Sequence, residues 1–105
     1  GEELLRRLKL RKRIDLFLFY KECLTNVIRH SEASRISTRV GMTPKQLCVT
    51  VTDNGQGTSA APRSLRRRAR LLGAKVSTTT PVEGGTCVQL VCAIKKRDLI
   101  KGASS

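Results

Sequence analysis

The sequence is poor in aromatic residues, in acidic residues and in long apolar runs. Its 105 residues include 2 Phe, 1 Tyr and no Trp, so aliphatic side chains must build most of a core. No apolar stretch approaches the roughly 18 residues that a membrane-spanning helix needs, and no signal peptide is recognisable. These absences favour a single cytoplasmic domain that makes no membrane contact of its own.

Acidic residues are heavily outnumbered, because 21 Lys and Arg stand against 8 Asp and Glu and give a net charge of +13. Such an excess indicates an anionic partner, or an acidic neighbouring domain in the whole protein. Nucleic acid is one candidate, through a basic patch made of Arg66, Arg67, Arg68, Arg70 and Lys75. The patch lacks the aromatic side chains on which bases stack, so we do not expect nucleic-acid binding.

The cysteines do not form a recognisable metal or disulfide pattern. They stand at Cys23, Cys48, Cys87 and Cys92, and no two have the CxxC spacing of a zinc site. Three of them, Cys23, Cys48 and Cys92, lie inside apolar runs. We therefore expect these three to be small buried hydrophobic residues.

Two helices are predicted from the spacing of apolar residues. The stronger signal covers residues 14–30, with one stripe expected to face the core: Ile14, Phe17, Leu18, Leu24, Val27 and Ile28. A basic helix is expected over residues 65–72, with Leu65, Ala69 and Leu72 facing inward and Gly73 ending it.

Four strands are predicted from alternating apolar and polar residues, over 35–40, 46–52, 75–80 and 87–95. They form two hairpins, separated by a loop and the basic helix. This order predicts an α+β fold with two layers, a mixed or antiparallel sheet and helices on one face. The chain is expected to be one domain over 1–105, with a lead-in over 1–12, a core over 13–95 and a flexible tail over 96–105.

The first polar constellation lies on the long helix. Glu22 and Asn26 are four residues apart and Arg29 follows three later, so all three point to one side. A carboxylate, an amide oxygen and a cation can together hold Mg²⁺ and a phosphate. Spacing alone leaves the alternative of a solvated helix face open.

The second and third constellations contain glycines beside strands. Asp53 and Asn54 end a strand and are followed by Gly55, Gln56 and Gly57. A buried carboxylate there can accept a hydrogen bond from an exocyclic amine, and the glycines permit close approach of a ligand. The last strand is preceded by Gly84, Gly85 and Thr86, whose hydroxyl can join Asp53 at the same ligand. Plain surface turns are the alternative for each segment taken alone.

Together these segments resemble the ATP-binding catalytic domain of bacterial sensor histidine kinases, in the GHKL ATPase superfamily. The N box of that family is similar to KECLTNVIRHSEAS at 21–34, and its glycine box is similar to DNGQG at 53–57. Its closing stretch is similar to RRRARLLGAKVSTTTPVEGGTCVQL at 66–90. The resemblance covers about residues 13–95 and implies a GHKL-type α/β sandwich, with ATP between the N-box helix and a mobile lid.

The resemblance also implies roles at the phosphate end of the nucleotide. Asn26 would ligate the Mg²⁺ that bridges the phosphates. Glu22 would be the catalytic residue that orients a metal-bound water or assists the attacking group. Arg29 would contact the phosphates.

At the adenine end, the resemblance implies that Asp53 binds the amine of the base. Gly55 and Gly57 would shape the pocket, Gly85 would permit close approach, and Thr86 would support Asp53. The ligand is therefore expected to be ATP with Mg²⁺.

The function that the resemblance implies is that of a histidine protein kinase in a two-component system. The γ-phosphoryl group would pass in line to a histidine on a dimerisation domain of the same protein, outside this chain, with a response regulator as a further partner. His30, the single histidine, ends the N box and is not expected to be the acceptor, so the chain alone should not phosphorylate itself.

One departure from the family leaves an alternative open. The family has a second glycine motif in the lid, where this chain has Ser59, Ala60, Ala61 and Pro62. The backbone N–H groups that wrap the phosphates would then be missing, unless side-chain cations replace them: Arg63, Arg66 and Arg68. The alternative is a degenerate, nucleotide-blind interaction domain of the same fold.

Overall fold

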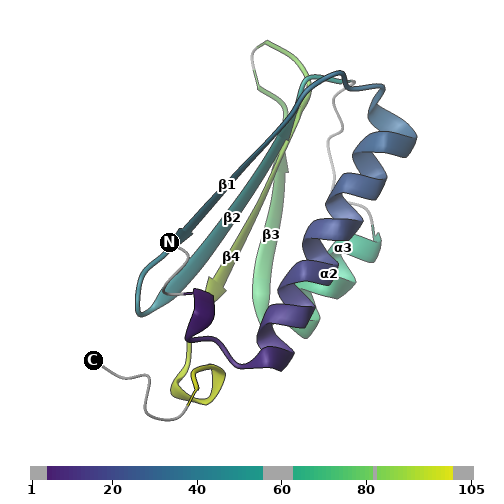
Figure 1. Ribbon diagram of the computed structural model, residues 1–105. Coiled ribbons are helices and arrows are strands. Elements are labelled where there is room, and N and C mark those ends of the chain that lie inside the picture. The colour runs from purple at the N-terminus through teal and green to yellow at the C-terminus, as the bar shows by residue number, and fades with distance from the viewer. Residues whose placement is uncertain (1–4, 56–62, 82, 101–105) are drawn as a thin grey trace.

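A four-stranded antiparallel sheet carries two helices on one of its faces (Figure 1). This computed structural model describes residues 5–55, 63–81 and 83–100. Helix α2 (Leu10–Asn26) continues into a π-helical turn, η1 (Val27–Ser31), and helix α3 (Arg63–Leu71) lies beside α2. The two-layer α+β fold expected from the sequence is confirmed.

The strands are β1 (Ile36–Met42), β2 (Gln46–Asp53), β3 (Ala74–Thr79) and β4 (Thr86–Ala93). Their order in the sheet is β1-β2-β4-β3, and all three pairings are antiparallel, so the sheet is not mixed. Both predicted hairpins are present as β1–β2 and β3–β4. The central pair, β2 with β4, joins the two hairpins and places the end of β2 beside the start of β4.

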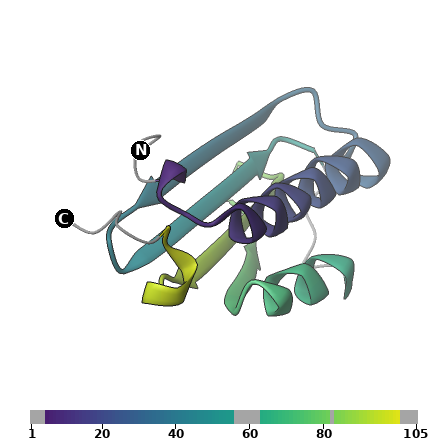
Figure 2. The same cartoon turned by 60° about the horizontal axis from the view of Figure 1, so that its bottom comes forward.

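The core lies between the sheet and the helices, as Figure 2 shows from below. Strands β2 and β4 alternate buried and more exposed side chains, as their sequences predict. The inward residues predicted for α3 are also buried. The core residues come from both layers: Leu8, Phe19, Cys23, Val27, Leu47, Val49, Val51, Leu65, Ala69, Leu72, Val88, Leu90, Cys92 and Ile94.

The predicted core stripe of α2 is mostly wrong. Ile14, Phe17 and Ile28 are 45%, 62% and 76% exposed, and within α2 itself Phe19 and Cys23 are the buried residues. The cause is that α2 has apolar residues on two sides. The side with Phe19 and Cys23 packs on the sheet, and most of the predicted stripe faces away from it.

The edge strand β1 is also less buried than its alternation suggests. Its pairing with β2 puts Thr38 opposite Val51 and Val40 opposite Val49, on the side of the sheet that carries the helices. Both β1 residues remain exposed all the same. The Thr38 and Val40 face of β1 therefore lies on the helix side of the sheet, but its edge position leaves that face only partly covered.

The described parts of the expected lead-in and tail, residues 5–12 and 96–100, take part in the fold. Leu8 is fully buried and forms an isolated antiparallel bridge with Leu99. The N–H of Lys9 donates to the carbonyl of Asp98 at 2.8 Å, and the N–H of Ile100 donates to the carbonyl of Arg7 at 2.7 Å. Around a short 3₁₀ turn, η2 (Lys96–Asp98), the segment after β4 thus closes the end of the core near the start of α2.

The cysteines are free thiols, so no disulfide forms. Cys23 and Cys92 are buried as expected, whereas Cys48 is only half-buried because it points to the uncovered face of the sheet. Within the described ranges, no group of His, Cys, Asp and Glu has the geometry of a metal cluster. None of the described helices is long and apolar enough to cross a membrane.

Candidate functional site

Asp53 is a buried carboxylate at the end of β2, only 5% exposed. Alternation along β2 turns it to the same side as Val49 and Val51, the side that carries the helices. Its Oδ1 accepts the N–H of Gly55 at 2.8 Å, which holds the side chain in place. No Lys or Arg of the described residues forms an ion pair with it. Burying a carboxylate without a cation is costly, which favours a polar ligand at this position.

The start of β4 packs tightly against Asp53. Thr86 pairs with Asp53 across the two strands and is buried. Gly85 has a φ of +84°, and a Cβ there would overlap the carbonyl oxygen of Asp53 and stand 3.0 Å from Cα of Asn54. Only glycine fits this conformation and this contact. The structure therefore brings together Asp53, Gly55, Gly85 and Thr86, four of the residues singled out in the sequence.

Asn54 is a structural residue of this site that sequence reasoning missed. Its side-chain Oδ1 accepts the N–H groups of Ser34 and Arg35, both at 2.9 Å, and its Nδ2 donates to Oγ of Ser34 at 3.0 Å. Its own N–H donates to the carbonyl of Arg35 at 3.2 Å. Asn54 thus fastens the end of β2 to the segment that leaves η1. The available signal was an Asn directly after a strand, where its side chain often bonds backbone groups.

Asn26 and Glu22 occupy the last turns of α2, and both are half-buried. The Nδ2 atom of Asn26 is fully buried and has no hydrogen-bond partner among the described residues. A half-turn of the amide exchanges its nitrogen and oxygen, so this position can equally present an oxygen. An unsatisfied buried amide beside a carboxylate fits the oxygen ligands that Mg²⁺ prefers.

Glu22 also lines a cavity of about 530 Å³ between α2 and α3. The other lining residues belong to α3 and are mostly cationic: Arg63, Ser64, Arg67, Arg68 and Leu71. The sequence suggested that Arg63, Arg66 and Arg68 replace the backbone N–H groups of the lid. Arg63 and Arg68 line this cavity, and Arg66 does not. Three guanidinium groups near one carboxylate give the cavity an excess of positive charge, which suits an anion.

Cys23, next to Glu22, is not a nucleophile. Burial raises the pKa of the Cys23 thiol to about 12, and the negative charge of Glu22 adds to the rise. A thiol with so high a pKa is protonated near neutral pH and unreactive.

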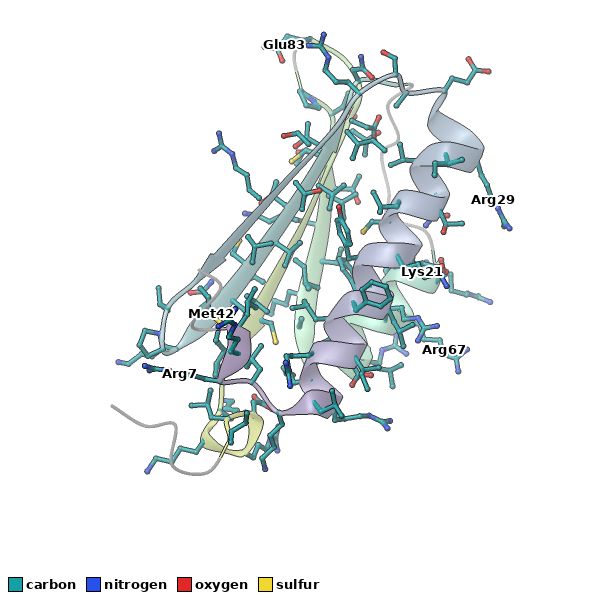
Figure 3. The ribbon with its side chains drawn as sticks, in the orientation of Figure 1. Arg7, Lys21, Arg29, Met42, Arg67 and Glu83 are labelled. Atoms are coloured by element: carbon teal, nitrogen blue, oxygen red, sulfur yellow. The ribbon has the colours of Figure 1, made fainter. Side chains whose placement is uncertain are left out.

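One predicted residue, Arg29, is not brought to Asp53, and a second, Gly57, falls outside the described part of the chain. Arg29 is exposed in η1, and Figure 3 shows its side chain extending away from the sheet. Gly57 lies outside the described residues, as do Ser59, Ala60, Ala61 and Pro62.

The two ends of the expected pocket lie at one end of the molecule. In Figure 1, the end of α2, the end of β2 and the start of β4 all lie at the top. A cavity of about 180 Å³ is lined by residues that include Arg35, Asp53, Asn54 and Pro81. Asn26 and Glu22 do not line it. Ser37 and Thr52 also line this cavity and lie on the face of the sheet away from the helices, so the cavity does not join Asp53 to Asn26. A single ligand that spans from Asp53 to Asn26 stays a prediction.

Comparison with known proteins identifies the family of this chain. The model of the family "Histidine kinase-, DNA gyrase B-, and HSP90-like ATPase" matches residues 11–93. The sensor histidine kinase LiaS of Bacillus subtilis (strain 168) is 36% identical over 84 residues, which is 71% of this chain and 23% of LiaS. The chain therefore spans less than a quarter of the length of this relative.

Solved structures of similar fold include the blue-light activated histidine kinase of Erythrobacter litoralis EL346. It has a TM-score of 0.65 and 25% identity, over 81% of this chain and 31% of that one. The ATP binding domain of PrrB from Mycobacterium tuberculosis has a TM-score of 0.57 over 78% of this chain and 67% of that one, and at 19% identity it supports the fold alone. On the match over residues 11–93, the chain belongs to the family of histidine kinase-, DNA gyrase B- and HSP90-like ATPases.

Proposed function

We propose that this domain binds ATP with Mg²⁺ and donates the γ-phosphoryl group to a histidine on a dimerisation domain of its own protein. A response regulator would then take the phosphoryl group from that histidine. The observation that carries the proposal is the buried carboxylate of Asp53, which accepts the N–H of Gly55 and lies against Gly85. The end of β2, where Asp53 lies, and the end of α2, where Asn26 and Glu22 lie, are at the same end of the molecule (Figure 1). The similarity to LiaS, named as a sensor histidine kinase, supports the same activity.

At the adenine end, Asp53 accepts a hydrogen bond from the amine of the base. The position is buried, so a base that lacks this amine leaves the carboxylate unsatisfied at a cost of about 1–3 kcal/mol. The domain should therefore prefer ATP to GTP. Thr86, adjacent to Asp53 across the strand pair, supports the same contact.

At the phosphate end, Asn26 would supply an oxygen to Mg²⁺ and Glu22 would orient a water or the attacking group. Bound there, Mg²⁺ would supply charge neutralisation to the phosphates. Arg63, Arg67 and Arg68 line the cavity next to Glu22 and add positive charge for the transferred group. Catalysis rests on positioning and charge neutralisation, because the transition state is loose.

A nucleotide-blind interaction domain of the same fold is the second candidate. It is favoured by the sequence Ser-Ala-Ala-Pro at 59–62, where the related kinases have a glycine motif. This candidate predicts no nucleotide binding at all.

Isothermal titration with a non-hydrolysable ATP analogue and Mg²⁺ separates the two candidates. We expect binding that is at least about tenfold weaker for the GTP analogue and for Asp53→Ala. Asp15→Ala removes a carboxylate near the other end of α2 and is the matched control, with affinity unchanged. Thermal unfolding checks that both variants fold. No heat with the ATP analogue, or equal affinity for both nucleotides, would rule out the proposal.

A further inference from the structure

Helix α2 has a second apolar face, which points away from the sheet. Its members form the outer stripe, defined as Leu10, Ile14, Phe17 and Leu24. Three of them are exposed and Leu24 is half-buried, and the exposed Ile28 follows in η1. A helix that packs on one side of its own domain needs only one apolar stripe, so the outer stripe is not explained by the fold.

The outer stripe follows the spacing of a coiled-coil seam. With Lys21 included, its positions are separated by alternate steps of four and three residues, from Leu10 to Leu24. Steps of four and three are the heptad pattern by which one helix packs along another. On the β1 side, an apolar groove of about 290 Å³ adjoins the stripe, lined by residues that include Phe17, Tyr20 and Val40. Such a groove can receive a side chain from a second helix.

No element in the part of the chain that the structure describes covers the outer stripe. The sheet lies on one side of α2 and α3 lies beside it, and the remaining side is open in both views (Figures 1 and 2). Lys21 also extends to the solvent there, as Figure 3 shows.

Among the described residues, the unpaired charges beside the outer stripe are cationic. Arg13 and Lys21 of α2 and Arg29 of η1 are exposed along it, whereas Arg11 pairs with Asp15 at 3.7 Å. The two carboxylates of α2 point elsewhere, since Asp15 and Glu22 each line a cavity shared with α3. A second copy of α2 would bring cations against cations, which is unfavourable.

We propose that the outer stripe binds an α-helix of a partner that has a 3-4 apolar seam flanked by Asp and Glu. Apolar contacts supply affinity, and the acidic flanks meet the cations of α2. Lys21 occupies a seam position, where a lone charged residue fixes register by pairing with one acidic residue of the partner. The inference does not depend on nucleotide binding.

The test uses the whole chain and a labelled synthetic helix of about 20 residues, long enough to span α2. It carries Leu and Ile at 3-4 spacing and Glu at the flanking positions, and a second peptide has Lys in place of Glu. We expect fluorescence anisotropy to show binding of the Glu peptide that weakens as salt is raised. The Lys peptide should bind at least about tenfold more weakly.

A double variant, Ile14→Ala with Phe17→Ala, should lose at least about tenfold in affinity for the Glu peptide. The matched control is Leu71→Ala with Ile100→Ala. Leu71 is 62% exposed, as is Phe17, and Ile100 is 44% exposed against 45% for Ile14. The control should bind as the unmodified chain does, and circular dichroism confirms that both fold. Equal binding by the double variant, or equal binding of both peptides, would overturn the proposal.

Lys21→Leu adds a test of specificity. It makes the seam continuous, so we expect this variant to discriminate less between the two peptides and to associate with itself in sedimentation. If the variant kept the same selectivity between the two peptides and did not self-associate, the proposed role of Lys21 in fixing register would be wrong. If the unmodified chain dimerises, and the Ile14/Phe17 variant does not, then a second copy occupies the stripe and the acidic helix is wrong.

Discussion

The two faces of α2 contain similar residues but have different environments. Phe19 and Cys23 are buried against the sheet, whereas Ile14 and Phe17 are largely exposed on the opposite face. Both faces satisfy a helical apolar period, and the outer one satisfies it better. The comparison shows that helical periodicity identifies a helix without identifying which side packs on its own domain.

Replacing each phenylalanine in turn tests the difference between the two faces and has the largest expected effect on stability. Phe19→Ala removes a buried ring and should lower the free energy of unfolding by about 3–5 kcal/mol. Phe17→Ala removes a ring that is 62% exposed and should cost less than about 1 kcal/mol. Urea unfolding followed by circular dichroism measures both. If Phe17→Ala destabilised the chain as much as Phe19→Ala, the outer stripe would belong to the core after all.

The fold could be predicted from the sequence where a residue pattern is compatible with only one packing arrangement. In β2, the alternation of Leu47, Val49 and Val51 with smaller residues admits only one inward face. The ambiguity of α2 and the burial of Leu8 could not be predicted locally. Leu8 is buried because residues after β4 return to pair with it, and such a long-range contact leaves no periodic signal in a short polar segment.

The candidate site was predictable in part for a similar reason. Asp53, Gly55, Gly85 and Thr86 were singled out because they stand at or beside strand ends, and the pairing of β2 with β4 brings them together. Asn54 was missed because its role depends on the segment from η1 passing beside it. Arg29 shares the helical side of Asn26 by spacing, but it lies in η1, where the π-helical turn changes the period.

Two glycines allow a second comparison of the same residue type in two different environments. Gly85→Ala should cost about 2–3 kcal/mol, because its φ is positive and the new Cβ overlaps the carbonyl of Asp53. Gly41→Ala, in β1 with open space around it, should be neutral or slightly stabilising. Thermal unfolding compares them. A neutral Gly85→Ala would mean that β4 does not approach Asp53 so closely.

The smallest expected effect concerns the thiol on the inner face of α2. Burial raises the pKa of Cys23 to about 12 from an ordinary value of 9.0, with Glu22 adding to the rise. The unfolded thiol therefore ionises first as pH increases, so stability falls from pH 9 toward pH 12 and is unaffected by this group below pH 9. At pH 10 the loss should be about 1 kcal/mol.

Cys23→Ala isolates this contribution, because the two chains share every other titrating group. Near neutral pH the variant should be less stable than the unmodified chain, since it leaves a small cavity. The difference in unfolding free energy should shrink by about 1 kcal/mol between pH 7.5 and pH 10, where only the unmodified chain has the thiol to ionise on unfolding. A difference that stays constant with pH would show that Cys23 ionises as readily in the folded chain as in the unfolded one. The inner face of α2 would then be as accessible to water as the outer face.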